Sequence, residues 1–281
     1  MADYRIVIAA TKLHARHARA GRLPWQGRRT DRVCLSVKEH CRSRRELAAV
    51  KDLKQRQNRG DMEHIVLLGD SIFDNAPYVP AGTDVTAQLR ATLGPRHAVS
   101  LLARDGDVLA DMPAQLARLG RLDAPASWLL VSCGGNDVLG LVGEMQRPVR
   151  TVLEGMALLA GWQAAFARDY RHMLDLVLAQ GKPTALATIY DSVPGLAPGL
   201  RTALAAFNDI ILREAVARRL PVLDLRLVCT DAGDYASASP IEPSAQGAAR
   251  IAAAIGVLVR AHDRAAGHTV VYGAAGRGGE E

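Results

Sequence analysis

The feature of this chain that most constrains its fold is a series of short apolar runs, each followed by a segment with helical periodicity. The runs occupy residues 64–68, 98–103, 127–132, 184–190 and 222–227. Continuous apolar runs of this length are typical of strands that are buried on both faces of a parallel sheet. Parallel strands need crossover connections, which are usually helices. The pattern therefore predicts an α/β fold with a five-stranded parallel sheet covered by helices on both faces.

The segments between the runs predict the covering helices. Residues 85–93 and 114–119 are short candidates, and residues 251–258 belong to the last helix. Two longer segments carry apolar residues at spacings of three and four, which gives each segment one apolar stripe. The stripes consist of Phe166, Tyr170, Leu174 and Val177 or Leu178, and of Leu204, Phe207, Ile211, Ala215 and Val216. In such a fold ligands bind beyond the carboxyl ends of the strands, so we expect a site in the loops that follow them.

The basic charge of the chain lies in its first part. Residues 1–61 contain 16 Lys and Arg against 6 Asp and Glu, whereas residues 62–281 contain 19 against 23. We expect residues 1–61 to lie outside the fold, as a disordered leader or as sequence upstream of a true start at Met62. A basic arm that binds nucleic acid is an alternative that this segment alone suggests. The folded domain is predicted to span residues 62–266, with a flexible tail at residues 267–281.

Composition and motifs argue against several other classes of protein. The only apolar run in the first segment, residues 6–10, is too short for a signal-peptide core or a membrane span, so we expect a cytoplasmic protein. The four cysteines have no CxxC spacing and no histidine cluster beside them, which predicts neither a disulfide framework nor a metal site. No phosphate-binding glycine loop follows a strand, and the sequence indicates no cofactor.

The residues with chemical potential follow the first three predicted strands. Residues 69–71 read Gly-Asp-Ser, residues 105–107 read Asp-Gly-Asp, and residues 134–137 read Gly-Gly-Asn-Asp. Taken singly, each has an ordinary structural explanation, because Ser, Asn and Asp cap helices and Gly permits tight turns. Together they bring a hydroxyl, an open main-chain N–H and a side-chain amide to one rim of the sheet. An acyl-transfer site needs these parts, namely a nucleophile and donors for the oxyanion.

In order and spacing, these three elements resemble conserved blocks of the SGNH hydrolase family, the GDSL-like lipases and esterases. The resemblance covers about residues 62–264. It implies a flavodoxin-like three-layer αβα sandwich that hydrolyses a small-molecule ester, such as a lipid or an acylated sugar, without a metal. Carried over by position, Ser71 resembles the nucleophile. Its own N–H, the N–H of Gly106 and the amide of Asn136 resemble the oxyanion hole. Four residues are expected to support them: Asp70, Gly135, Asp137 and Asp234.

The last block of the family, normally Asp-x-x-His-Pro before the final helix, departs from the pattern in this chain. Residues 239–243 read Ser-Pro-Ile-Glu-Pro, so Glu242 stands where the His that acts as general base is expected. Ser239 stands where the orienting Asp is expected. The other histidines are expected away from the rim; His262, for example, should lie roughly 22 Å along the last helix. The same expectation covers His64, His97, His172 and His268.

Two hypotheses remain open for this altered site. In the first, Ser71 attacks the ester and Glu242 is the base, with a pKa raised by burial. Asp231 or Asp234 in the preceding loop would then share a proton with it. In the second, the domain has lost hydrolysis and binds an acyl or carbohydrate ligand in the same cleft. The survival of the nucleophile and the oxyanion donors favours hydrolysis, because a binding site needs neither.

The segment at residues 139–156 follows the third-strand motif and is a candidate for the wall of the cleft. Its apolar candidates are Met145, Leu153 and Met156, joined by Trp162, with core packing as the alternative for each. An aromatic content of 4% provides no conspicuous platform for stacking a sugar. The sequence does not specify which ester would be the substrate.

Overall fold

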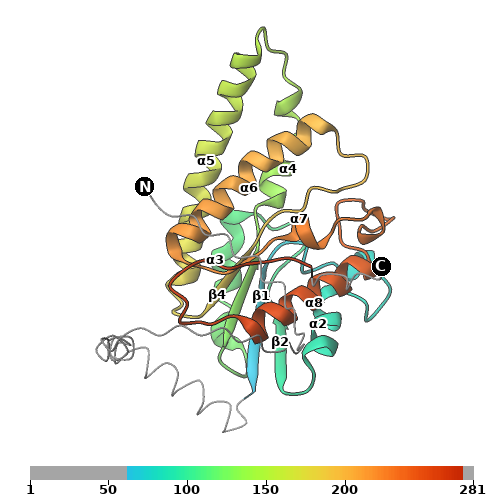
Figure 1. Cartoon of the computed structure of the whole chain (residues 1–281), viewed down its shortest axis with the longest axis vertical. Coiled ribbons are helices and arrows are strands. Elements are labelled where there is room, and N and C mark those ends of the chain that lie inside the picture. Colours follow the sequence, from blue (N-terminus) through green and yellow to red (C-terminus); the bar gives the residue numbers. More distant parts are fainter. Residues whose placement is uncertain (1–61, 275–281) are drawn as a thin grey trace, which may run out of the picture. The chain divides into compact units, whose positions relative to one another are not determined.

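The computed structural model of the protein describes residues 62–274. They form a six-stranded parallel sheet in the order β2–β1–β3–β4–β5–β6 (Figure 1). The strands are β1 (Glu63–Gly69), β2 (His97–Leu101), β3 (Trp128–Ser132), β4 (Thr184–Ala187), β5 (Val222–Leu223) and β6 (Val271–Tyr272). The leader or basic arm expected at residues 1–61 lies outside the described residues, as do residues 275–281.

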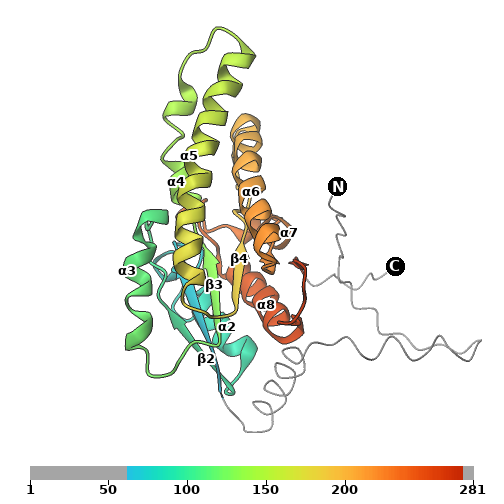
Figure 2. The ribbon, with the colours of Figure 1, turned by 90° about the vertical axis from the view of Figure 1, so that its left-hand side faces the viewer.

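Helices cover both faces of the sheet, as the alternating pattern predicts. Along the described chain the α-helices are α2 (Val85–Leu93), α3 (Met112–Leu116), α4 (Gly135–Leu139), α5 (Val152–Leu178), α6 (Pro198–Arg218), α7 (Leu225–Val228) and α8 (Ala245–Ala261). Short 3₁₀ helices are η1 (Ala76–Tyr78), η2 (Leu109–Asp111), η3 (Leu119–Arg121), η4 (Glu144–Gln146) and η5 (Ala232–Asp234). Helices α2 and α8 lie on one face, and α3, α5 and α6 lie on the other (Figure 2). The result is a three-layer αβα arrangement.

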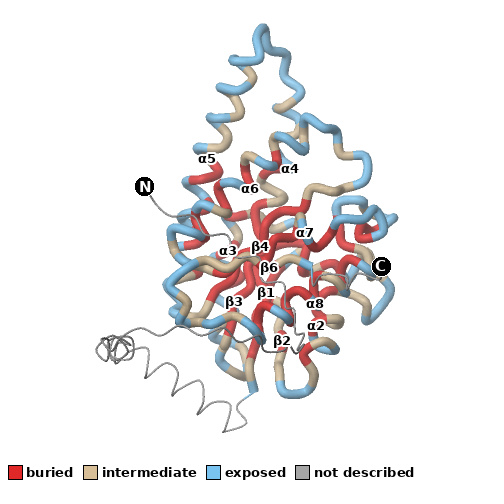
Figure 3. Tube along the Cα trace, viewed as in Figure 1, coloured by how far each residue is buried: buried red, intermediate tan, exposed pale blue. Residues whose placement is uncertain are grey.

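The alternation of side chains along each strand divides the apolar core in two. On β1, Ile65 and Leu67 face α2 and α8, whereas Val66 and Leu68 face α3, α5 and α6. All four side chains are buried, and Figure 3 shows this burial along the central strands. A strand that is buried on both faces must be apolar throughout, which is why the runs were recognisable in the sequence.

The sheet has six strands, so the expectation of five was wrong. The sixth strand, β6, pairs in parallel with β5 and lies inside the segment 267–281, which was expected to be a flexible tail. Two residues give too weak a periodicity to predict a strand. The pairing satisfies the outer edge of β5, where the N–H of Val222 donates to Val270 and that of Asp224 donates to Tyr272.

Other boundaries also differ from the predicted ones; the fourth run, predicted over residues 184–190, is a strand only at Thr184–Ala187. The fifth apolar run, predicted as a strand over residues 222–227, is a strand only at Val222–Leu223, because the Asp224 side chain accepts the N–H of Arg226 and begins α7. The first long helix begins at Val152, well before the apolar stripe that starts at Phe166. Among the described residues, none of the helices has the length and apolar character needed to span a membrane.

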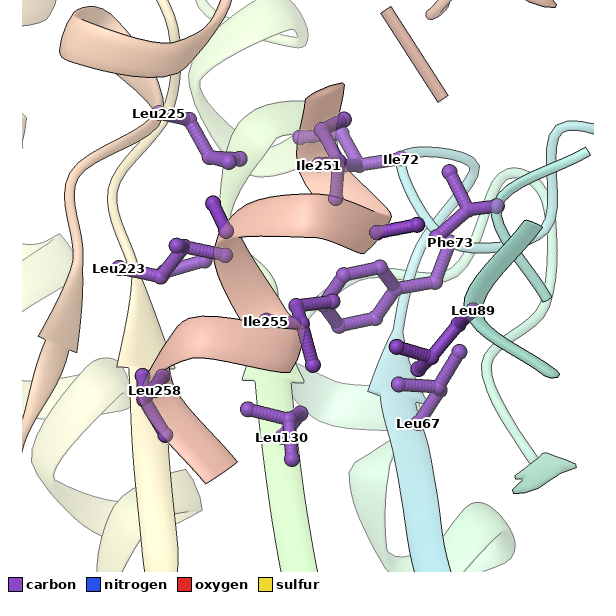
Figure 4. Close-up of a cluster of buried hydrophobic side chains, with 14 of the residues drawn as sticks. Leu67, Ile72, Phe73, Leu89, Leu130, Leu223, Leu225, Ile251, Ile255 and Leu258 are labelled. Atoms are coloured by element: carbon purple, nitrogen blue, oxygen red, sulfur yellow. The ribbon is translucent and has the colours of Figure 1, made fainter. Parts of the chain in front are cut away.

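Phe73 offers a test of the packing between α8 and the sheet. Its side chain is 1% exposed and lies beside Ile255 and Leu89 in the first half of the core (Figure 4). We expect Phe73→Ala to lower the free energy of unfolding by about 3–5 kcal/mol, because it removes a buried ring and leaves a cavity. Urea unfolding measures the change. Leu153→Ala is the control, since Leu153 is 79% exposed and should change stability by about 0.5 kcal/mol or less. Equal effects of the two substitutions would contradict this packing.

Candidate active site

Ser71 lies in a tight turn directly beyond β1. Gly69, the last residue of that strand, has a φ of 126°, and a Cβ at this position would lie 1.7 Å from the carbonyl oxygen of Ser132 on β3. Glycine alone tolerates both the conformation and the close approach. The N–H of Asp70 then donates to the same Ser132 oxygen at 3.0 Å. This contact fixes the turn, and Ser71 with it, at the carboxyl ends of β1 and β3.

Gln115 on α3 holds the same turn through its side-chain amide. Its Oε1 accepts the N–H of Gly69 at 2.8 Å, and its Nε2 donates to the Gly69 carbonyl at 2.6 Å. The same nitrogen donates to Oδ2 of Asp107 at 2.7 Å, in the loop after β2. Gln115 therefore ties the two loops together. The sequence analysis missed it, because a single glutamine in a predicted helix carries no local signal of a buried role.

Three N–H groups in the positions expected for an oxyanion hole remain open to a ligand. Within residues 62–274, neither the main-chain N–H of Ser71 nor that of Gly106 donates to a protein acceptor. Gly106 has a φ of 83°, so its turn requires the conformation that glycine adopts most readily. Asn136 donates one amide N–H to the Asp107 carbonyl at 2.9 Å, which orients the side chain and leaves the second N–H for a ligand.

Three of the four expected supporting residues, Asp70, Gly135 and Asp137, lie around this turn. Asp70 accepts the N–H of Ile72 at 3.2 Å and a hydrogen bond from the main chain of Gly135 at the start of α4. Burial raises the pKa of Asp70 from 3.8 to about 7, and nearby carboxylate charges add to the rise. Asp137 accepts the N–H of Leu109 at 3.1 Å, and burial raises its pKa as well. These contacts connect the loops after β1, β2 and β3.

Glu242 lies in the loop before α8 and faces Ser71. Burial raises the pKa of Glu242 from 4.5 to about 7, a hydrogen bond with Ser71 lowers it, and the charge of Asp105 raises it. Among the described residues, Oε2 of Glu242 has no hydrogen-bond partner. Ser239 contacts Glu242 through its main chain, because its carbonyl accepts the Glu242 N–H at 2.9 Å. At neutral pH the Glu242 side chain is therefore close to the midpoint of its titration.

The loop that carries Glu242 is anchored by two buried side chains. Asn75, at the end of the turn that contains Ser71, donates its Nδ2 to the carbonyl of Pro243 at 3.0 Å. Its Oδ1 accepts the N–H that begins α2 at 2.9 Å, and the residue is completely buried. Tyr190 donates its hydroxyl to the carbonyl of Ile241 at 2.6 Å. The sequence analysis missed both anchors, because their partners are distant in the chain.

The structure places Asp234 elsewhere than the sequence analysis expected. Its carboxylate binds Arg250 at 2.5 Å, Gln246 at 3.0 Å and the N–H of Asp231 at 2.9 Å. The carboxylate of Asp231 also binds Arg250, at 2.7 Å. Both carboxylate oxygens of Asp234 are bound in this way, so the expectation that Asp234 shares a proton with Glu242 was wrong; the same expectation for Asp231 stays a prediction. Asp234 instead supports the loop before α8, since its carbonyl accepts the N–H that precedes this helix.

The histidines of the described chain lie away from Ser71. His64, on β1, contacts the carbonyl of Ala124 at 2.8 Å and the hydroxyl of Ser100 at 2.9 Å. His262 packs against Trp128, which begins β3 and therefore marks the opposite end of the strands. Of the remaining histidines, His97 begins β2, His172 lies on α5 and His268 precedes β6. Within residues 62–274, no group of three or more His, Cys, Asp or Glu is arranged to hold a metal ion.

A largely apolar cavity lies beside Ser71, Asn136 and Glu242. Its apolar walls come from α4, the loop after it, the end of β4 and the start of α6. They include Val138, Val142, Met145, Ile189, Leu200 and Leu204. Of the cleft-wall candidates, Met145 lines this cavity, whereas Leu153 and Met156 are 79% and 55% exposed and do not. An acyl chain next to the hydroxyl would find an apolar environment here.

Comparisons with known proteins agree with this fold. The sequence model of the GDSL-like Lipase/Acylhydrolase family matches residues 67–250. A similar solved structure, of a lipolytic G-D-S-L family member from Veillonella parvula DSM 2008, has 16% identity and a TM-score of 0.52, covering 70% of this chain and 97% of that one.

Two further structures are similar at the same level. Lipase Lip_vut3 from a goat rumen metagenome has 16% identity and a TM-score of 0.53, covering 72% of this chain and 99% of its own. Phospholipase A1 from Streptomyces albidoflavus NA297 has 14% identity and a TM-score of 0.51, covering 71% and 100%. These structures share the fold of this chain, and at such identities the similarity indicates the fold alone. No curated protein matches the sequence.

The raised pKa of Glu242 predicts a measurable effect on stability. Between pH 4.5 and about 7 the folded protein holds a proton that the unfolded chain has lost, so stability falls as the pH rises through this window. Glu242→Gln removes the fall, and we expect it to gain up to about 3 kcal/mol relative to the wild type between pH 5 and pH 8. Urea unfolding at both pH values measures the gain. The exposed control Glu154→Gln should show none, and a pH-independent difference for Glu242→Gln would contradict the prediction.

Proposed function

Because the chain belongs to the GDSL-like lipase/acylhydrolase family, we propose that it hydrolyses carboxylic esters, with Ser71 as nucleophile and Glu242 in place of the usual histidine base. The observation that carries the proposal is the contact between the Ser71 hydroxyl and a buried carboxyl group whose pKa is about 7. A general base acts best when its pKa is close to the working pH. Burial thus gives a carboxylate the proton affinity that an imidazole has in water.

The proposed reaction proceeds in two halves. Oγ of Ser71 attacks the ester carbonyl while Glu242 accepts the hydroxyl proton, and the oxyanion accepts hydrogen bonds from the N–H groups of Ser71, Gly106 and Asn136. The tetrahedral intermediate collapses, Glu242 returns the proton to the leaving alkoxide, and an acyl-enzyme remains. Water then attacks the acyl-enzyme, with Glu242 again as base, and Ser71 is regenerated. The apolar cavity would hold the acyl group during both halves.

A second candidate function is binding of an acyl or carbohydrate ligand without turnover. It is favoured by the Oε2 atom of Glu242, which has no hydrogen-bond partner among the described residues, so this carboxyl group lacks the second partner that an orienting Asp provides to a catalytic His. The apolar lining of the cavity would serve a bound acyl ligand equally well. Ester turnover that depends on the ionisation of Glu242 would support hydrolysis over binding without turnover.

The two catalytic residues can be tested with the full-length chain and a series of p-nitrophenyl acyl esters. We expect Ser71→Ala and Glu242→Gln each to lower kcat by at least about 10³-fold, because a nucleophile and its base act as a unit. Asn136→Ala should lower kcat by about 10²–10³-fold, the usual effect of a lost oxyanion donor. Ser237→Ala, an exposed serine outside the cavity, is the control. A wild type no faster than Ser71→Ala on every ester would instead favour the binding protein.

The charge of Asp105 predicts a shift in the pH profile. For the wild type, kcat/KM should rise with pH through a midpoint of about 7 as Glu242 loses its proton. The negative charge of Asp105 disfavours a second negative charge on Glu242 and raises its pKa. Asp105→Asn should therefore move the midpoint to lower pH. Asp209→Asn, an exposed aspartate paired with Arg213 on α6, should leave it in place. An unshifted midpoint in Asp105→Asn would argue against Glu242 as the titrating base.

A further inference from the structure

A second hollow lies between the first half of α5, η4 and the start of α6. Its walls are mostly apolar and include Val149, Leu158, Leu159 and Trp162. Small residues at Gly155, Gly199 and Ala203 leave the space between these helices unfilled. We call this hollow the distal groove. The cavity beside Ser71 is a different space that adjoins the distal groove on one side.

The distal groove and the cavity beside Ser71 share part of their walls. Met145 and Leu200 line both, so the two spaces lie on either side of the same pair of side chains. Both residues are only partly buried, and a methionine adapts its shape readily. A flexible apolar chain that starts at Ser71 and passes these side chains would therefore enter the distal groove.

The first half of α5 has little role in packing against the sheet. The first buried residue of this helix is Phe166, fourteen residues after its start at Val152. In Figures 1 and 3 this part of α5 extends beyond the sheet together with the preceding loop, and its surface is exposed. Leu159 and Trp162 pack against the second half of the core, whereas Val152, Leu153 and Met156, nearer the start of the helix, are 78%, 79% and 55% exposed. Exposed helix surfaces are usually polar, so the exposed apolar side chains of this part of α5 indicate a ligand or partner.

We propose that the distal groove binds the far end of a long acyl chain whose ester group lies at Ser71. This inference rests on the proposed function and narrows its substrate class to long-chain acyl esters. The shared wall at Met145 and Leu200 favours this occupant, because a chain anchored at Ser71 reaches the groove without a second binding event. Charge does not favour an anionic surface as the occupant, since residues 139–161 carry two Arg and two Glu. One such pair, Arg150 and Glu154, already forms a salt bridge.

Trp162 provides a test of binding that does not depend on catalysis. A stearic acid brominated in the distal half of its chain, added to the full-length protein at pH 6, should quench the emission of Trp162, because bromine quenches on contact. The contribution of Trp162 to the emission is the difference between the emission of the wild type and that of Trp162→Phe. We expect that contribution to be lost at saturation, and a short brominated acid should leave it unchanged. Trp128, buried at the opposite end of β3, should keep its emission. Unquenched Trp162 emission would overturn the proposal.

Ala203→Phe tests the same groove through turnover. Filling the groove should lower the ratio of kcat/KM for p-nitrophenyl palmitate to that for the butyrate ester by about tenfold, the worth of roughly two buried methylene groups. Ala205→Phe, on the exposed side of α6, is the matched control and should leave the ratio unchanged. An unchanged ratio in Ala203→Phe, with butyrate still hydrolysed, would overturn the distal groove and leave the proposed function intact. Quenching of Trp162 without hydrolysis of any ester would support the distal groove and overturn the proposed function.

Discussion

The close approach of β1 to β3 at Gly69 is the constraint on which the site depends. A side chain at this position would collide with the Ser132 carbonyl, so the two strand ends come together only because residue 69 has none. The contact turns the chain sharply, and of the N–H groups at residues 70–74 only that of Ser71 has no acceptor within the described chain. Gln115 then binds both main-chain polar groups of Gly69 and links them to Asp107. Ser71, Gly106 and Asn136 thus lie in three loops that hydrogen bonds through Gln115 and Asp107 tie together.

The electrostatics of the site follow from burial. Asp70 and Glu242 both have pKa values of about 7, since each carboxyl group is largely removed from water. Charging either group costs folding free energy that a surface carboxylate would not cost. The fold tolerates this because the loops around them are held by buried hydrogen bonds from Asn75 and Tyr190. A site of this kind loses stability at neutral pH in exchange for carboxyl groups that titrate there.

The sequence predicted the layers and the loops of the site because both rest on local patterns. Buried parallel strands are apolar throughout, and the residues after them are the only place where a chain of this kind can present Ser71, Gly106 and Asn136 together. The strand β6 could not be predicted, since two residues carry no periodicity, and β5 was predicted four residues too long because Asp224 begins α7 after Leu223. The roles of Asn75 and Gln115 could not be predicted for a different reason. Their roles depend on partners 168 and 46 positions away, which only the folded chain brings near.

The anchoring of the loop before α8 decides what a glutamate at position 242 can do. An imidazole has a pKa close to neutrality in water, whereas a carboxyl group reaches that range only while it stays buried. The hydrogen bonds of Asn75 to Pro243 and of Tyr190 to Ile241 hold the residues on either side of Glu242. They keep its side chain against Ser71 and out of water. An enzyme built in this way would owe its base strength to the rigidity of the loop, so any loosening there would weaken the base as well as displace it.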